Sequence, residues 1–420
     1  MKKLKIIFTD KVLRGKILFV IAILLLIRVL AAIPLPGVNK EALSQSLSSD
    51  SLFGLINIFS GGGLSSLSII MLGVGPYITA SIIMQLLTVL VPKFKAMHQE
   101  EGELGRKKFS QYSRILTVPL ALLQGYAILT LLISQKIIPA LSFGNYIFNI
   151  IIITAGTMLL MWLGEQINEY GIGNGVSLII FGGIVATIPT SLVQTYASFD
   201  VSQIPIILAI LIVIIIVIYS IVLVTEAERP LAVTYSKQAT SFYGASGLTH
   251  TYIPLRLNQS GVMPIIFALS ILIMPSILVQ LLANSTNDFL RNMSASVSSF
   301  LANQFYYGII YFFLVVLFTY FYTAVTFDTE KTAENLQKSG AFISGFRPGE
   351  STANHIGEVL SRITLVGALF LGTVAVLPII LQAATGIQTL TVGGTSLLIA
   401  VSVVIDLVKK VEAQLTMQEY

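Results

Sequence analysis

The chain has 420 residues, of which 55% are hydrophobic and 11% are charged, and its formal net charge is +5. Water-soluble domains carry about a quarter charged residues, so this composition excludes a soluble globular protein and predicts an integral membrane protein. The chain contains no cysteine, which excludes disulfides, thiolate-bound metals and a thiol nucleophile.

The first predicted element is an apolar run from Ile17 to Ile33, which follows the basic residues Lys2, Lys3 and Lys5. It is longer than the apolar region of a signal peptide, contains Arg28 and ends in Ile33-Pro34-Leu35-Pro36-Gly37, so we expect a retained membrane helix and not a signal peptide. Ten runs approach the roughly 20 apolar residues that a helix needs to cross a bilayer. These predicted spans are about 16–33, 67–91, 114–134, 145–166, 173–193, 204–225, 261–283, 305–327, 361–383 and 390–408.

Residues 53–66 are apolar but too short to cross a membrane, and they contain three consecutive glycines, Gly61 to Gly63. Two interpretations stay open: an external loop resting on the surface, or a half-helix that folds back into a pore and blocks it. Non-helical backbone persists at membrane depth only where it is buried in protein or faces a water-filled cavity. The pattern predicts that a full helix begins near Leu67.

The basic residues predict the orientation of the ten spans. Of the 25 lysines and arginines, only Lys40, Lys136 and Arg291 fall in predicted outer loops, Arg28 falls inside the first span, and the other 21 lie in predicted inner segments or at their borders. Cytoplasmic loops collect Lys and Arg, so both termini are expected in the cytoplasm. The two long inner loops, about 226–260 and 328–360, are longer than simple connections require, and we expect them to be docking sites.

The spans hold almost no ionisable residues apart from Arg28 and Asp406, and the three histidines fall in predicted inner loops. A proton- or ion-coupled transporter usually keeps such a group at mid-membrane depth. Glu165 and Glu169 lie four residues apart, and we interpret them as two solvated charges at the cytoplasmic border and not as an acid/base pair. We therefore expect no enzymatic activity, no cofactor and no metal site. A passive conduit or scaffold driven by partners remains.

Several blocks of sequence resemble the SecY family, the central channel subunits of Sec protein translocases. They occur in order along nearly the whole chain: Ile33–Gly37, Phe59–Gly62, Pro76–Ile78, Gly105–Lys108, Met161–Ile167, Gly171–Gly175, Asn335–Phe342, Arg347–Glu350 and Gly393–Ile399. The resemblance implies an all-α integral membrane protein with ten transmembrane helices. It places them in two five-helix halves, 1–200 and 201–420, with inverted pseudo-twofold symmetry around a central hourglass pore.

The resemblance also implies which residues form the site. A ring of aliphatic side chains would close the waist of the pore: Val74, Ile78, Val176, Ile180, Ile266 and Ile399. Residues 57–67 would form a plug below the ring, carried by Asn57, Ile58, Phe59, Ser60, Gly61, Gly62, Gly63 and Leu64. Gln85 and Asn258 match polar positions at a lateral gate, where a hydrogen bond between them and ordinary capping or snorkelling amides are both open interpretations.

Four basic residues match docking positions for the SecA motor ATPase or the ribosome: Lys237, Arg256, Lys338 and Arg347. The tip of the first inner loop, Gln238–Gly244, lacks the basic residues usual in the family, so Arg347 is expected to carry more of the docking. The resemblance implies a channel in the bacterial inner membrane that passes unfolded secretory precursors across, or membrane helices sideways into, the lipid bilayer. It implies a SecE-like subunit, a SecG-like subunit, SecA and the ribosome as partners. The rival hypotheses are a small-solute secondary transporter and a non-conducting scaffold.

Overall fold

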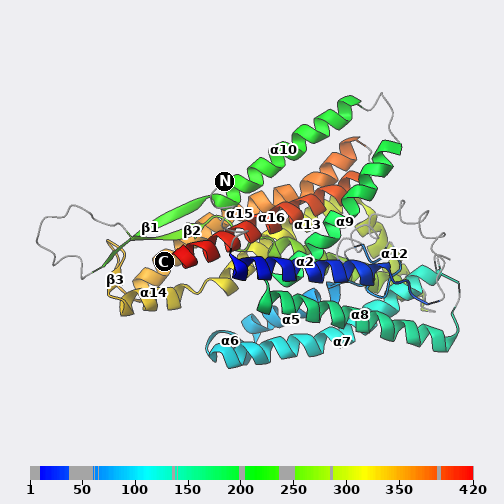
Figure 1. The fold of residues 1–420 in the computed structure, drawn as a ribbon, viewed down its shortest axis with the longest axis horizontal. Helices are drawn as coiled ribbons and strands as arrows, with labels where there is room; N and C mark the ends of the chain where they lie inside the picture. The colour runs from blue at the N-terminus through cyan, green and yellow to red at the C-terminus, as the bar shows by residue number, and fades with distance from the viewer. Residues whose placement is uncertain are drawn as a thin grey trace, which may run out of the picture. The chain divides into compact units, whose positions relative to one another are not determined.

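A computed structural model describes residues 10–36, 60, 62–64, 66–134, 138–139, 141–197, 204–235, 251–283, 287–385 and 389–419, and these are mostly helical (Figure 1). The chain divides into two compact units. The first comprises Met1–Ile210, Leu269–Gly308 and Leu377–Tyr420, and the second comprises Leu211–Ala268 and Ile309–Val376. Units defined by contact are not symmetry repeats, so the two predicted halves, 1–200 and 201–420, stay a prediction.

Every predicted span overlaps a helix. The ten helices are α2 (Lys11–Ala32), α5 (Gly75–Leu90), α7 (Gly102–Ser134), α8 (Phe143–Tyr170), α9 (Gly175–Ala197), α10 (Ile204–Glu226), α11 (Met263–Ala283), α13 (Gln304–Thr326), α15 (Glu350–Thr385) and α16 (Thr389–Glu419). Among the described residues, five of them (α2, α7, α8, α13 and α15) are long and apolar enough to cross a membrane unaided. A sixth candidate is α5 together with α6 (Pro92–Gln99), two helices bent by 110°. The remaining four predicted spans correspond to α9, α10, α11 and α16.

The second span begins later than predicted. Its helix was expected near Leu67, but α5 starts at Gly75, and the preceding residues 66–74 form turns. Leu67 and Gly73 have positive φ angles of 45° and 60°, which a right-handed helix does not accommodate. Pro76 then occupies the first turn of α5, where its missing N–H costs nothing.

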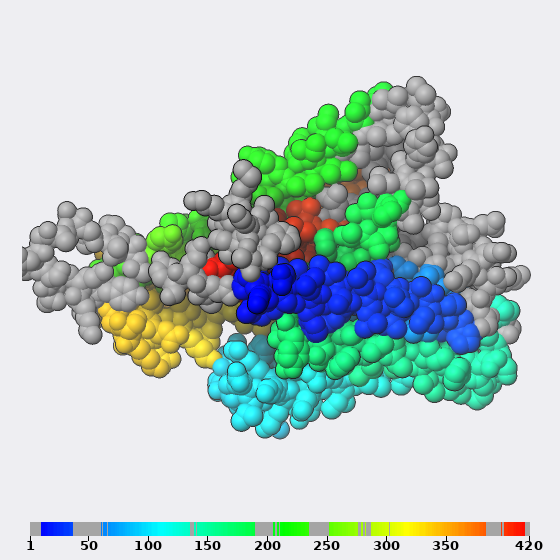
Figure 2. Space-filling model, in the orientation of Figure 1, coloured from blue at the N-terminus to red at the C-terminus, as the bar shows by residue number. Residues whose placement is uncertain are grey.

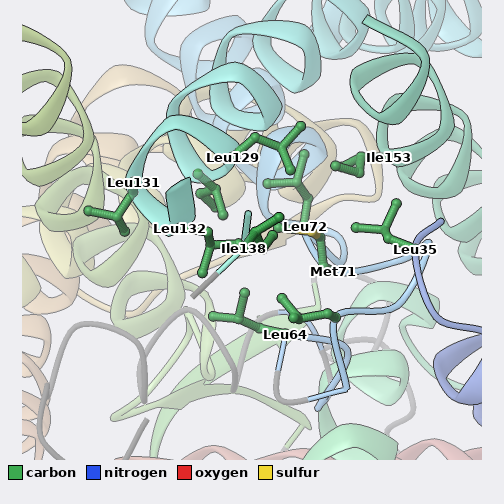
Figure 3. Close-up of a cluster of buried hydrophobic side chains, with 11 residues drawn as sticks. Leu35, Leu64, Met71, Leu72, Leu129, Leu131, Leu132, Ile138 and Ile153 are labelled. Carbon is green, nitrogen blue, oxygen red and sulfur yellow. The ribbon is translucent and has the colours of Figure 1, made fainter. Parts of the chain in front are cut away.

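One hydrophobic core of the first unit joins this turn segment to two long helices. Leu64, Leu67, Met71 and Leu72 are buried with side chains from α7 and α8 (Figure 3). The helices contribute Ile128, Leu129, Leu131, Leu132 and Ile153, and the connecting segments contribute Leu35 and Ile138. The segment is therefore part of the packed interior of its unit.

The second unit contains a small sheet that the sequence interpretation missed. Strands β1 (Glu228–Tyr235), β2 (Thr251–Arg256) and β3 (Ala341–Phe342) form an antiparallel sheet in the order β2-β1-β3. Glu228 pairs with Arg256, and Tyr235 pairs with Ala341. The sheet ties the two predicted docking loops together and shares a core with α15 and with α14 (Thr329–Lys338).

Large apolar side chains are exposed along the helices, as membrane-facing surfaces require. Helix α2 is coloured blue in Figure 2. The exposed fractions of its side chains Leu18, Leu25 and Val29 are 57%, 62% and 62%. Soluble monomers rarely present such a continuous apolar face to water. The same helix buries Leu13, Val20, Ile23 and Ile27, so one face packs inward and the other is suited to lipid.

Candidate plug and pore-lining residues

The described part of the predicted plug is attached to the end of α2. The main-chain nitrogen of Leu35 donates to Leu67 at 2.8 Å, and that of Ile69 donates to Ile33 at 3.1 Å. Between these bonds, Pro34 and Ser68 form an antiparallel bridge. The predicted topology would place this end of α2, and the attachment with it, on the outer side of the membrane.

Within the segment, side chains replace the hydrogen bonds that a helix would supply. The hydroxyl of Ser60 accepts from the nitrogen of Leu64 at 3.0 Å, and the hydroxyl of Ser68 donates to the oxygen of Gly63 at 3.1 Å. Gly62 has a φ of 86°, in the region that favours glycine. A Cβ on Gly63 would lie 2.9 Å from the oxygen of Ile70, so this turn closes only with glycine.

The neighbouring helices approach the segment closely. A Cβ on Gly156 of α8 would lie only 2.2 Å from the main-chain oxygen of Ile69. On the other side, a Cβ on Gly62 would lie 3.8 Å from Arg28 Nη1 of α2 and 3.7 Å from Thr187 Cγ2 of α9. The segment is thus enclosed by helices of its own unit.

Four of the predicted plug residues, Ser60, Gly62, Gly63 and Leu64, belong to this folded-back segment. The other four, Asn57, Ile58, Phe59 and Gly61, lie outside the described residues. Leu64 and Ser60 are buried, which favours a segment folded into protein over the alternative of a loop resting on the surface.

The predicted ring positions on α9 follow a tight turn between α8 and α9. The main-chain nitrogen of Gly175 donates to Oδ1 of Asn168 at 2.7 Å, and Oδ1 of Asn174 accepts from Val176 at 3.1 Å. A Cβ on Gly175 would lie 1.9 Å from the oxygen of Gly164. These contacts set where α9 begins, and therefore where Val176 and, one turn later, Ile180 lie.

The other ring positions occupy comparable buried places. Val74 is the N-cap residue of α5 and Ile78 lies in its first turn. Val74, Ile78, Ile180, Ile266 and Ile399 are at most 3% exposed, and Val176 is half-buried. Ile266 belongs to the second unit and the other five belong to the first. Their convergence into one ring stays a prediction.

The two predicted gate residues have local partners. The side-chain amide of Asn258 donates to the oxygen of Gly261 at 3.1 Å and accepts from the hydroxyl of Ser260 at 3.1 Å, in the turn before α11. On α5, Gln85 Nε2 lies 3.5 Å from the hydroxyl of Ser81. The printed bonds of Asn258 are therefore local, neither of them caps α11 through a main-chain N–H, and a contact with Gln85 stays a prediction.

Three of the predicted docking cations belong to the described residues of the second unit. Arg256 pairs with Glu228 at 3.4 Å across the sheet, and Lys338 pairs with Glu334 at 2.7 Å on α14. Arg347 is exposed just before α15, where its main-chain oxygen accepts from the hydroxyl of Thr352 at 2.8 Å. Lys237 and the loop tip Gln238–Gly244 lie outside the described residues.

One ion pair escaped the sequence interpretation. Glu165 was expected to be a solvated charge, but its side chain is only 17% exposed and pairs with Arg114 of α7 at 2.7 Å. Glu169 is exposed, as expected. The missed partner is 51 residues away, and the only available signal was that both residues lie at the same predicted membrane border. The ion pair connects α7 to α8 at that border.

The arrangement of these residues suits a segment that blocks a passage more than it suits a catalytic or metal-binding site. No group of three His, Asp or Glu residues within the described ranges is placed to hold a metal ion. The geometry offers a folded segment held by side-chain packing and by non-covalent hydrogen bonds, followed by the buried aliphatic residues Val74 and Ile78. Such a segment can be displaced without breaking a covalent bond or a long helix.

Comparisons with known proteins identify the fold and the family. The sequence profile of SecY matches residues 68–408. The protein translocase subunits SecY of Mycobacterium tuberculosis and Streptomyces coelicolor are 40% and 39% identical to this chain, covering 97% of it and 96% of each relative. A solved structure of a protein-conducting channel superposes with a TM-score of 0.66 at 19% identity, covering 96% of this chain and 93% of that one. Sec61 from a canine ribosome–channel complex superposes with a TM-score of 0.63 at 18% identity and the same coverage. This chain is an all-α membrane protein that belongs to the SecY family.

Proposed function

We propose that this chain is the channel subunit of a Sec translocon, passing unfolded secretory proteins across the membrane and releasing membrane helices sideways. The observation that carries the proposal is the segment from Ser60 to Val74, which folds back against the end of α2 instead of continuing as a helix. A structural relative is described as having a plug domain that stabilises the closed state of a translocation channel and maintains a membrane seal. A channel subunit needs no catalytic group, since partners supply the energy.

The proposed resting seal combines the plug with the ring. Residues 68–73 connect the plug to Val74, the ring residue that caps the start of α5. An apolar constriction resists wetting, so it blocks ions without a tight mechanical fit. Aliphatic side chains also offer a passing polypeptide no hydrogen-bonding partner. Displacing the segment would therefore pull on the first ring residue, which couples plug movement to pore opening.

The proposed sideways exit is a seam between α5 with α7 and α11 with α13, with Gln85 and Asn258 beside it. A signal sequence would open it by offering its own apolar helix to the seam. Gln85 Oε1 is buried and has no hydrogen-bond partner among the described residues, and an unpaired buried acceptor is costly. The unpaired oxygen favours a gate in which Gln85 gains a hydrogen-bond donor in one of its states.

The proposed partners dock on the inner side. The three-stranded sheet supports both inner loops, and Arg347 beside it suits two-pronged contacts with carboxylates or phosphates. We propose SecA and the ribosome as alternating partners here, and SecE-like and SecG-like subunits within the membrane. The proposed location is the bacterial inner membrane with both termini in the cytoplasm.

Reconstitution tests the proposal. The chain is incorporated into liposomes with SecE and SecA, and ATP-dependent transport of a secretory precursor is measured. Protected precursor is expected only with all three proteins and ATP. Solute uptake by the purified chain alone would favour a secondary transporter instead. Failure of a stalled precursor to cross-link to probes at Ile78 or Ile266 would favour a non-conducting scaffold.

Deletion of residues 57–67 tests the plug separately. Ion conductance through the resting channel is expected to rise, while precursor transport with SecA continues. Unchanged resting conductance would remove the blocking role without removing the channel.

A further inference from the structure

Helix α12 (Asp288–Ala302) lies in the predicted outer loop between α11 and α13, where no helix was expected from the sequence. One of its stripes packs against its own unit. Ser294 is 2% exposed, and its hydroxyl donates to the main-chain oxygen of Val279 in α11 at 2.7 Å. Leu290, Val297 and Leu301 on the same stripe are half-buried. The inner side of the helix is therefore fixed.

A second apolar stripe of α12 is exposed. The exposed fractions of Phe289, Met293 and Phe300 are 73%, 42% and 44%. At about 100° per residue these three positions lie within about 40° of one another around the helix. Ser296 shares this stripe, Arg291 and Ser298 lie opposite it, and Asn292 and Ser299 lie on its polar flank. The apolar half of α12 is thus wider than the face that its own unit covers.

The exposed stripe is continuous with the start of a membrane helix. Only Asn303 separates α12 from α13, and its side chain caps α13 by accepting from the nitrogen of Phe305 at 3.0 Å. The ring of Phe300 stacks on that of Tyr306, with centroids 5.0 Å apart and planes inclined by 19°. Phe305 and Tyr306 are 70% and 47% exposed, as is typical of aromatic residues at a membrane–water interface.

We propose that α12 is an interfacial helix that lies in the outer surface of the bilayer, with Phe289, Met293 and Phe300 immersed among the lipids. Its apolar stripe continues into the lipid-facing end of α13, and a one-residue link prevents the helix from leaving that surface. An amphipathic helix with this division buries its apolar face at the boundary between headgroups and acyl chains. The inference requires only that the chain spans the membrane, so it stands apart from the channel function.

The charges on α12 do not favour anionic lipids over zwitterionic ones. Its two ionised side chains, Asp288 and Arg291, pair with each other at 2.7 Å. Attraction to anionic lipid normally comes from unpaired Lys and Arg on the polar face. We therefore expect α12 to insert equally well into zwitterionic and anionic bilayers. The inserted helix would hold the outer ends of α11 and α13 at the height of the membrane surface.

The absence of cysteine allows a direct test with the full chain in lipid nanodiscs. Single variants Phe289→Cys, Met293→Cys and Phe300→Cys carry a nitroxide label, and power-saturation EPR compares its access to oxygen with its access to a water-soluble nickel chelate. Oxygen access is expected to exceed nickel access at all three positions, in phosphatidylcholine alone and with added phosphatidylglycerol. Asn292→Cys and Ser299→Cys are the matched controls on the polar flank and should favour nickel.

Two results would overturn the proposal. Nickel access at Phe289, Met293 and Phe300 equal to that at the controls would place the stripe in water. Labels shielded from both reagents would place it against protein, either a second copy or another subunit. A label-free measurement guards against perturbation by the nitroxide: Phe300→Trp in a Trp162→Phe background should be quenched by lipids brominated near the headgroup. Absence of that quenching would also contradict an interfacial position.

Discussion

The hydroxyl of Ser66 donates a hydrogen bond to the main-chain oxygen of Ala31 at 2.7 Å, across 35 positions of sequence. This side-chain hydrogen bond adds to the main-chain bonds that attach the folded-back segment to the end of α2. Ala31 lies in the last turn of α2, where main-chain oxygens have no partner further along the helix. Ser66 thus satisfies an acceptor that the end of the helix leaves open.

Replacing Ser66 with alanine should weaken the plug without unfolding the protein. Loss of one such hydrogen bond costs about 1 kcal/mol, which corresponds to a roughly fivefold larger population of the displaced segment. The resting ion conductance of reconstituted channels should rise by a similar factor in planar bilayers. Ser220→Ala is the matched control, because that hydroxyl bonds within its own helix at 2.8 Å. Equal conductance of the two variants would contradict the role of Ser66.

Gly156 should tolerate no side chain. A Cβ there would lie 2.2 Å from the oxygen of Ile69, and a helix facing a packed segment cannot move away freely. Overpacking of this kind typically costs about 1–3 kcal/mol, so Gly156→Ala should lower the midpoint of thermal unfolding in detergent and raise resting conductance. Gly144→Ala on the same helix meets nothing within 4 Å, and it should leave the midpoint unchanged or slightly higher. An unchanged midpoint for Gly156→Ala would show that the segment is not packed against α8.

The positions of the membrane helices were predictable because length and hydropathy alone define a span. The start of α5 was not, since residues 67–74 are as apolar as a helix and differ only in backbone conformation. Positive φ at Leu67 and the pairing of Ser68 with Pro34 depend on contacts with α2. Hydropathy carries no information on either.

The candidate site was predicted only through family resemblance. Val74 or Ile180 alone would be interpreted as ordinary buried aliphatic residues, and nothing in their neighbourhood marks a pore. The sheet of the inner loops was missed because β1 includes a charged and Pro-containing start, Glu228–Pro230. The ion pair of Arg114 with Glu165 was missed because it joins two helices whose relative rotation the pattern does not specify.

The side-chain oxygen of Asn168 should be the atom that matters for the position of α9. Its Oδ1 accepts from the nitrogen of Gly175 and so sets the start of α9, on which two ring positions lie. Asn168→Leu leaves that nitrogen without its partner, which typically costs about 1–3 kcal/mol. Precursor transport is expected to fall and resting conductance to rise. Asn168→Asp keeps the acceptor and is the control. If Asn168→Leu behaves like Asn168→Asp, the turn does not position the ring.

Arg347 should contribute more to docking than Lys338. Lys338 and Arg256 each face a carboxylate of their own unit, which reduces the charge that they offer to a partner. The side chain of Arg347 is exposed, and no carboxylate pairs with it among the described residues. Arg347→Ala is therefore expected to reduce SecA or ribosome binding several-fold more than Lys338→Ala, with Arg347→Lys intermediate because a lysine cannot make a two-pronged contact. Sedimentation or surface-plasmon binding to reconstituted channels checks the ranking, and equal losses would refute it.

His98 should make the inner end of the first unit sensitive to acid. It lies on α6, where its ring contacts that of Phe109, with centroids 4.7 Å apart, beside a core of Met84, Met97 and Phe109. Burial lowers the pKa of His98, and the positive charge of Arg106 lowers this pKa further. His98 is therefore neutral in the folded protein at pH 7, and the unfolded chain takes up a proton more readily.

The sign of the pH dependence follows from that difference. The contribution of His98 to stability is complete above its ordinary pKa of about 6.5 and declines as the pH falls below that value towards the lowered pKa. The slope cannot exceed about 1.4 kcal/mol per pH unit for one group, and it stays well below this limit because the ring is only half-buried. Thermal unfolding between pH 7.5 and 5.5 should show a smaller decrease in midpoint for His98→Leu than for the unmodified chain. Identical pH profiles for His98→Leu and the unmodified chain would assign the acid sensitivity elsewhere.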